Sequence, residues 1–130
     1  MELNEIYNEC ERCNVDVYYY PFNHTKAISL PDGTIAIDVD KVENSIEEKE
    51  IVAHELGHIN TGSFYNIYTP LDIIGKHERR AEKWALKKLV PENELNEAIQ
   101  NGIVEPWELA EYFGVSEMFI KKAIELYFNT

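Results

Sequence analysis

Cysteine is scarce in this chain of 130 residues, which contains only Cys10 and Cys13. They form a single C-x-x-C pair, with no second pair and no βαβ pattern around it. A complete cysteine zinc site or a thioredoxin-like redox motif would need one or the other. We therefore expect two reduced thiols near the end of an N-terminal helix.

Positive charge is also scarce, because 12 Lys and Arg face 24 Asp and Glu, giving a net charge of −12. A general nucleic-acid binder needs a basic face, so we expect no direct nucleic-acid partner. No apolar run approaches the roughly 20 residues of a membrane span, so we expect no membrane partner. The acidic N-terminus, residues 1–6, lacks the basic and apolar regions of a signal peptide. A cytoplasmic protein is the resulting expectation.

Apolar residues are plentiful at 45%, and aromatic residues make up 12% of the chain. This length and composition predict one globular domain over residues 1–130, with 92–130 as a helical segment of that domain. Periodicity predicts strands at 15–20, 26–30 and 34–38, and helices at 2–13, 45–60, 76–89, 92–101, 106–113 and 116–128. The fold class is therefore α+β. We expect a small three-stranded antiparallel sheet packed on the second and third helices.

The second predicted helix carries the sequence His54-Glu55-Leu56-Gly57-His58, an H-E-x-x-H motif. Ser45 is expected to begin this helix as an N-cap, with Glu48 completing a capping box. Residues i and i+4 lie on one helix face, so both imidazoles can share one Zn²⁺. Glu55 follows the first histidine, where its carboxylate can act as general base without being a ligand. The spacing predicts two zinc ligands and a catalytic carboxylate.

A catalytic zinc usually has a third protein ligand. Thr61 and Phe64 stand where an extended H-E-x-x-H-x-x-G-x-x-H motif needs glycine and histidine, so a nearby third histidine is excluded. Downstream candidates are Asp72, His77, Glu78 and Glu82. Among them we favour Glu78 as ligand, because the helix beneath it is strongly predicted. Glu82, one turn further on, is expected to accept the free ring N–H of a ligating histidine.

These segments resemble the ImmA/IrrE-type metallo-endopeptidases, whose pattern is H-E-L-G-H, then E-x-x-A-N/D-x-F-A and a closing L-L-x-P. The matching segments are 54–58, 78–85 and 89–91, and the resemblance extends from about residue 37 to residue 115. Glu82 replaces the usual Asn or Asp, and Trp84 replaces the usual Phe. The separation of His58 and Glu78 is similar to that in thermolysin-like gluzincins.

The resemblance implies a zinc endopeptidase with a protein substrate, such as a helix-turn-helix repressor of a phage or mobile element. Tyr65 and Tyr68, in the predicted 61–75 loop, are candidates to shape the cleft or donate to the oxyanion. One alternative is a catalytically weak or inactive zinc-binding module that regulates a partner by binding. Another is a DNA-binding regulator built on residues 109–127, but the acidic balance there opposes phosphate binding.

Overall fold

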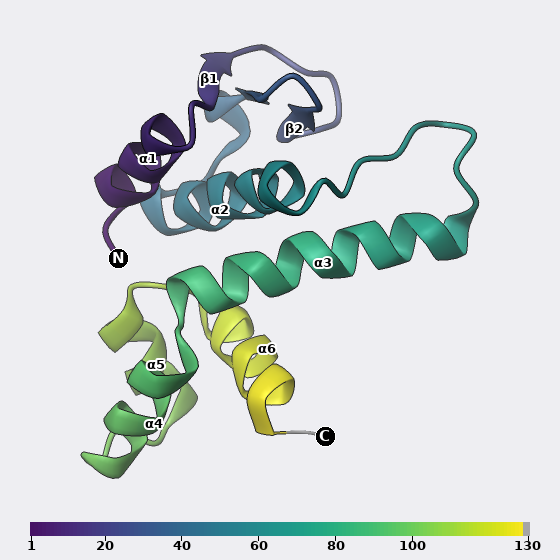
Figure 1. The fold of residues 1–130 in the computed structure, drawn as a ribbon. Helices are drawn as coiled ribbons and strands as arrows, with labels where there is room; N and C mark the ends of the chain where they lie inside the picture. Colours follow the sequence, from purple (N-terminus) through teal and green to yellow (C-terminus); the bar gives the residue numbers. More distant parts are fainter. Residues whose placement is uncertain (129–130) are drawn as a thin grey trace.

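The computed structural model describes residues 1–128, which form six α-helices and a three-stranded sheet (Figure 1). In chain order the elements are α1 (Leu3–Arg12), β1 (Asp16–Tyr19), β2 (Ala27–Leu30), β3 (Thr34–Ile37), a 3₁₀ turn η1 (Val39–Lys41), α2 (Ser45–Thr61), α3 (Leu71–Leu89), α4 (Glu92–Gln100), α5 (Pro106–Phe113) and α6 (Glu117–Phe128). The α+β class is confirmed. No helix in this range is long and apolar enough to cross a bilayer.

The sheet is mixed, so the prediction of a purely antiparallel sheet was wrong. β2 and β3 form the expected antiparallel hairpin, but β3 lies between β2 and β1 and runs parallel to β1. Consecutive strands usually pair, whereas here residues 20–26 carry the chain past the position that β3 occupies. Asp38 holds this connection in place, since its Oδ2 accepts from the Phe22 N–H at 3.0 Å and from Lys41 Nζ at 2.6 Å.

The start of α2 and the start of α3 both differ from the predictions. α2 begins at Ser45, but the capping residue is Asn44, whose Oδ1 accepts from the Glu47 N–H at 2.9 Å. α3 begins at Leu71 rather than Lys76, because Pro70 starts the helix and Gly75 is accommodated within it. The loop between the helices is therefore residues 62–70, shorter than predicted.

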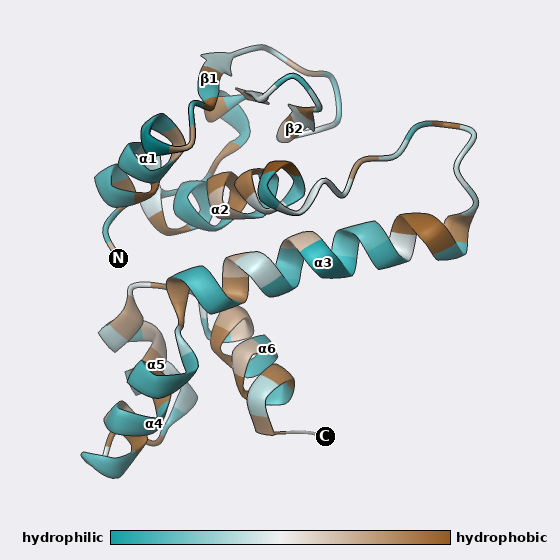
Figure 2. Cartoon of the chain, in the orientation of Figure 1, coloured by the Kyte–Doolittle hydropathy of each residue, from teal (hydrophilic) through white to brown (hydrophobic). Residues whose placement is uncertain are grey.

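α3 is the longest helix, and it packs against α2 along one side and α6 along another (Figure 1). The hydrophobic core between these layers includes Ile35, Leu56, Leu89 and Ile120, all within 2% of complete burial. Figure 2 shows hydrophobic and hydrophilic residues intermixed along α2, which contacts α1, the sheet and α3. α1 covers the core on one side, where it buries Ile6 and Cys10. Burial of this surface fixes α2 and α3 relative to each other, and these two helices carry the predicted metal ligands.

Candidate metal centre

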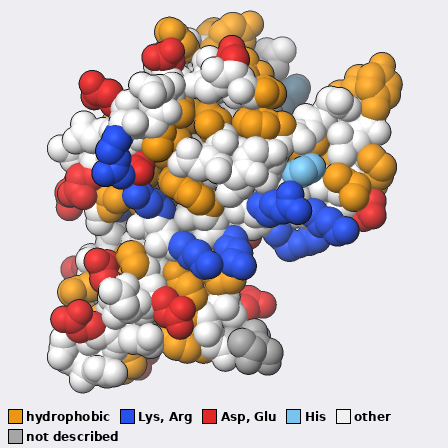
Figure 3. Space-filling model, viewed as in Figure 1, with side chains coloured by type: hydrophobic (Ala, Val, Ile, Leu, Met, Phe, Trp, Pro, Cys, Tyr) orange, Lys and Arg blue, Asp and Glu red, His pale blue; other side chains and the backbone are white. Residues whose placement is uncertain are grey.

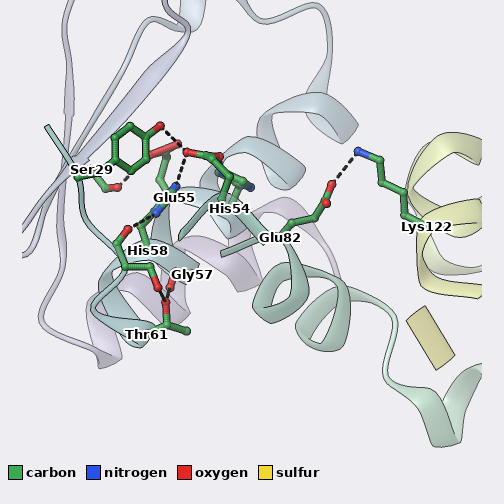
Figure 4. A network of polar contacts seen from close by, with 11 residues as sticks. Ser29, His54, Glu55, Gly57, His58, Thr61, Glu82 and Lys122 are labelled. Carbon is green, nitrogen blue, oxygen red and sulfur yellow. Dashed lines mark hydrogen bonds and ion pairs between the residues drawn. The ribbon is translucent and has the colours of Figure 1, made fainter. Parts of the chain in front are cut away.

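His54, His58 and Glu78 come together between α2 and α3, as the sequence predicts (Figure 4). One donor atom from each lies within 4.8 Å of the others. His54 Nε2 is 2.8 Å from Glu78 Oε2, and His58 Nε2 is 3.2 Å from Glu78 Oε1. Two imidazoles and one carboxylate are a usual catalytic zinc ligand set. The arrangement is therefore compatible with a zinc site.

Gly57, inside the motif, sets how closely the two ligand-bearing helices approach. A Cβ built on Gly57 would lie 2.5 Å from the Ala81 carbonyl oxygen and 3.1 Å from Ala81 Cα. These distances are shorter than van der Waals contact, so only glycine allows the backbones to come this near. Ala81 is one turn beyond Glu78 on α3, so this contact brings Glu78 to the two histidines.

His58 is held in one orientation by the end of its own helix. Gly62 has φ of +64°, which ends α2 with a left-handed residue and turns the chain back on itself. The buried Ser63 thereby directs its carbonyl oxygen to His58 Nδ1, at 2.6 Å. Thr61 Oγ1 donates to the Gly57 carbonyl and contacts Ser63 Oγ, reinforcing the turn. With a proton fixed on Nδ1, the Nε2 atom of His58 is left as a metal donor.

Glu55 lies beside the ligands and contacts the sheet. Its Oε1 accepts a hydrogen bond from Ser29 Oγ of β2 at 2.9 Å. Burial raises the pKa of Glu55 above its usual value, while the nearby His54 and the Ser29 hydrogen bond act in the opposite direction. A carboxylate beside a metal site is placed to accept and donate protons as a general base and acid. Sequence reasoning missed Ser29, because no local signal links it to a residue 26 positions later.

Tyr65 lies at the rim of the site and contacts a ligand. Its hydroxyl donates to Glu78 Oε1 at 2.6 Å, and this bond raises the Tyr65 pKa to about 12. Burial alone would raise the pKa of Glu78, but hydrogen bonds from Tyr65 and His54 lower it overall. Behind Tyr65, the His77 ring stacks at 6.3 Å between centroids, a contact the sequence did not indicate. Tyr68 is 86% exposed and lies outside the cleft.

Two acidic candidates are placed away from the ligand cluster. Glu82 Oε1 accepts from Lys122 Nζ of α6 at 2.7 Å (Figure 4), so in this structure it bonds to α6 and not to a histidine. For His58, the Ser63 carbonyl and not Glu82 accepts the free ring N–H. Asp72 is exposed in the first turn of α3 and is not part of the ligand cluster.

The cluster opens into a cleft of about 390 Å³ between the sheet and the loop after α2. Residues from β2, α2, the 62–70 loop and α3 line it, including Ala27, Ser29, Glu55, Phe64 and Tyr65. β2 is an edge strand, since β3 is its only sheet neighbour in residues 1–128. The cleft therefore places a metal-ligand cluster beside a carboxylate and an open strand edge.

The chain matches a known protein family. The sequence profile of the IrrE N-terminal-like domain, a peptidase M78 family, matches residues 10–125 and thus nearly all of the chain. A search of curated proteins found no relative. The matched region contains every residue of the cluster described above.

Proposed function

The chain belongs to the IrrE N-terminal-like family of peptidase domains, and from this premise we propose that it is a zinc-dependent endopeptidase. The observation that carries the proposal is the joint placement of His54, His58 and Glu78 around one point with Glu55 beside them. A purely structural zinc site is usually closed by four protein ligands. Here three donors face an open cleft, which leaves room for a substrate.

An extended peptide is the substrate form that the cleft favours. The Asp38 N–H donates to the Lys26 carbonyl, so in this antiparallel ladder Ile28 and Leu30 direct their backbone groups to β3. Ala27 and Ser29 consequently direct theirs away from β3, and both residues line the cleft. A substrate strand can add to this edge through main-chain hydrogen bonds, independent of its side chains. This supports a protein substrate over a small molecule.

Each side chain then has a role in hydrolysis. Zinc held by His54, His58 and Glu78 would polarise the scissile carbonyl and lower the pKa of a water molecule towards about 7. Glu55 accepts the proton of the attacking water and passes it to the leaving nitrogen. Ser29 holds Oε1 of Glu55 and leaves Oε2 for this transfer. Tyr65, which also lines the cleft, is our candidate donor to the developing oxyanion.

We further propose that the substrate is a regulatory protein, such as a helix-turn-helix repressor of a phage or mobile element. This rests on the family resemblance together with the strand edge, which selects an accessible extended segment. The alternative is a zinc-binding module that regulates such a partner by binding it without cleavage. Retention of Glu55, poised by Ser29 at the cleft, favours the enzyme, since a binding module has no need of it.

The test is co-expression with a neighbouring repressor, followed by mass spectrometry of the repressor and metal analysis of the purified chain. We expect about one zinc per chain and a cleaved repressor. Glu55→Gln should retain zinc and lose cleavage, and Glu78→Ala should lose zinc. Asp72→Asn, outside the cleft, is the matched control and should change neither. Cleavage of the repressor by Glu55→Gln at the wild-type rate would refute the assignment of Glu55 as general base. If the wild-type chain bound the repressor stably without cleaving it, the zinc-binding module would be favoured.

A further inference from the structure

Positive charge is concentrated on α3 although the chain as a whole is acidic. Six of the twelve Lys and Arg residues lie on this helix. Five of them are exposed and form no ion pair or side-chain hydrogen bond with any residue in 1–128: Lys76, Arg79, Arg80, Lys83 and Lys87. We call these five the basic stripe. Figure 3 shows Lys and Arg side chains gathered along the line of this helix.

The five residues share one face of the helix. At 3.6 residues per turn they fall within a sector of about 100°, and the stripe is about 16 Å long. Glu78 lies on the roughly opposite face of α3, where it reaches the metal-ligand cluster. A partner bound to the basic stripe would therefore leave the cleft open.

The fold does not explain this arrangement. Neighbours within the stripe are spaced i,i+3 or i,i+4, as in Lys76–Arg80 and Lys83–Lys87, and like charges at these spacings destabilise a helix. A solvated helix face usually alternates acids and bases, and this chain has two acids for every base. Lys88, next to the stripe, shows the ordinary pattern, since it pairs with Glu9 at 3.0 Å and lies near the Trp84 ring.

Exposed apolar side chains lie at the N-terminal end of the same helix. Ile67 is 89% exposed, and Tyr68 and Leu71 are each 86% exposed. We call these three the apolar tip. Figure 2 shows a strongly hydrophobic first turn of α3 at the edge of the molecule, and Figure 3 shows hydrophobic side chains there beside the basic ones. Exposed apolar groups next to arginine are typical of protein–protein contact sites.

Charge complementarity and the apolar tip together indicate the occupant. A nucleic-acid duplex carries a phosphate charge about every 1.7 Å along its length. A duplex extends well beyond the stripe, and the rest of the chain, which is strongly acidic at a net charge of −12, would repel its phosphates. A short acidic protein segment can place its charges on the stripe alone, and its apolar side chains can use the tip. We propose that the basic stripe and apolar tip of α3 form a docking surface for an acidic segment of a partner protein that also carries apolar residues.

A binding experiment with the full chain tests this independently of peptidase activity. The probe is a fluorescein-labelled peptide of about 12 residues that consists of Glu and two Leu. As a helix, a peptide of this length is long enough to follow the stripe. Its matched peptide carries Gln in place of every Glu. Fluorescence anisotropy should give tighter binding of the Glu peptide, with affinity falling as salt rises. NMR chemical-shift changes should map to α3.

The variant Arg80→Gln/Lys83→Gln should weaken binding of the Glu peptide about five-fold, the scale of two exposed ion pairs. The matched control Arg12→Gln/Lys121→Gln removes the same charge elsewhere and should leave binding unchanged. All affected side chains are exposed, so thermal melts should confirm intact folds. Equal affinity for the two peptides, or insensitivity to the stripe variant, would overturn the proposal. It would also be overturned by stripe-dependent binding to duplex DNA that is tighter than to the Glu peptide, or by stripe-dependent self-association of the chain.

Discussion

The contact between Gly57 and Ala81 predicts how a single methyl group would affect the metal site. In Gly57→Ala the new Cβ would lie 2.5 Å from the Ala81 carbonyl oxygen, whereas ordinary contacts begin near 3.4 Å. The atom it meets belongs to the backbone, so α3 must move by about 1 Å to relieve the overlap. Overpacking of this kind costs about 1–3 kcal/mol. With an unfolding entropy of about 0.27 kcal/mol/K for 130 residues, Tm should fall by about 4–11 °C.

Gly57→Ala should lower the affinity for zinc more than it lowers the stability of the fold. Metal–ligand distances tolerate deviations of only about 0.2 Å, and a shift of α3 moves Glu78 away from His54 and His58. We expect zinc affinity to fall by at least about ten-fold, which corresponds to about 1.4 kcal/mol of lost coordination. Competition with a chromophoric chelator measures this affinity, and circular dichroism measures Tm.

The control is Gly75→Ala on α3. A Cβ at Gly75 meets only the end of the flexible Arg79 side chain, at 3.2 Å. Alanine is also the better helix former, by about 1 kcal/mol, so this variant should match or exceed wild-type stability and keep zinc. If Gly57→Ala kept both wild-type Tm and wild-type zinc affinity, the close approach at Ala81 would not be what positions Glu78.

Three other predictions concern Ser29, Asp38 and the metal. Ser29→Ala removes a hydrogen bond that opposes the raised pKa of Glu55, so the acid limb of the pH profile of kcat/KM should move to higher pH; an unchanged limb would exclude a role for Ser29 in setting that pKa. The hydrogen bond from Lys41 lowers the pKa of Asp38 below its usual 3.8, so its contribution to stability should be present above about pH 4 and be lost as pH falls through the folded-state pKa. Urea unfolding of Asp38→Asn should show a weaker decline in acid than wild type, and parallel curves would contradict this. Chelation of zinc should leave the far-ultraviolet circular dichroism unchanged, because α2 and α3 are held by core packing. Zinc at about 100 times its Kd should add about 2.7 kcal/mol of stability, or about 10 °C in Tm; unfolding on chelation would show that the metal holds the fold.

The helices and the metal-ligand cluster were largely predictable because their signals are local. H-E-x-x-H needs one helix, and Glu78 lies on a second helix with strong periodicity. The supporting contacts were not predictable in the same way. Ser29 reaches Glu55 only once β2 has packed on α2. Ser63 acts through its carbonyl, a group that every residue has, so only the left-handed turn at Gly62 gives it a role.

The errors in the fold have a common cause, which is competition between local and tertiary preferences. Consecutive strands usually pair, which favours an antiparallel pair of β1 and β2. In the structure Asp38 instead holds the 20–26 connection, and β3 lies between β1 and β2. The sequence predicts that Gly75 belongs to a loop, yet α3 continues through it. Glu82 shares a helix face with Glu78, but at one turn further along it is close enough to α6 to pair with Lys122.

Lys49 and Glu50, adjacent residues of α2, connect this helix to the C-terminal helices α5 and α6. The buried Lys49 donates to the Met1 carbonyl at 2.6 Å and to the Gly114 carbonyl, where α5 ends. Its neighbour Glu50 accepts from the Ser116 N–H at 2.7 Å, where α6 begins. Truncation after α3 would leave the buried Lys49 ammonium group with one partner fewer, and it would leave the half-buried Glu50 carboxylate without its bonds to Ser116. Recombination in evolution could therefore not exchange α4–α6 freely between relatives, because any replacement must again supply a carbonyl for Lys49 and a helix start for Glu50.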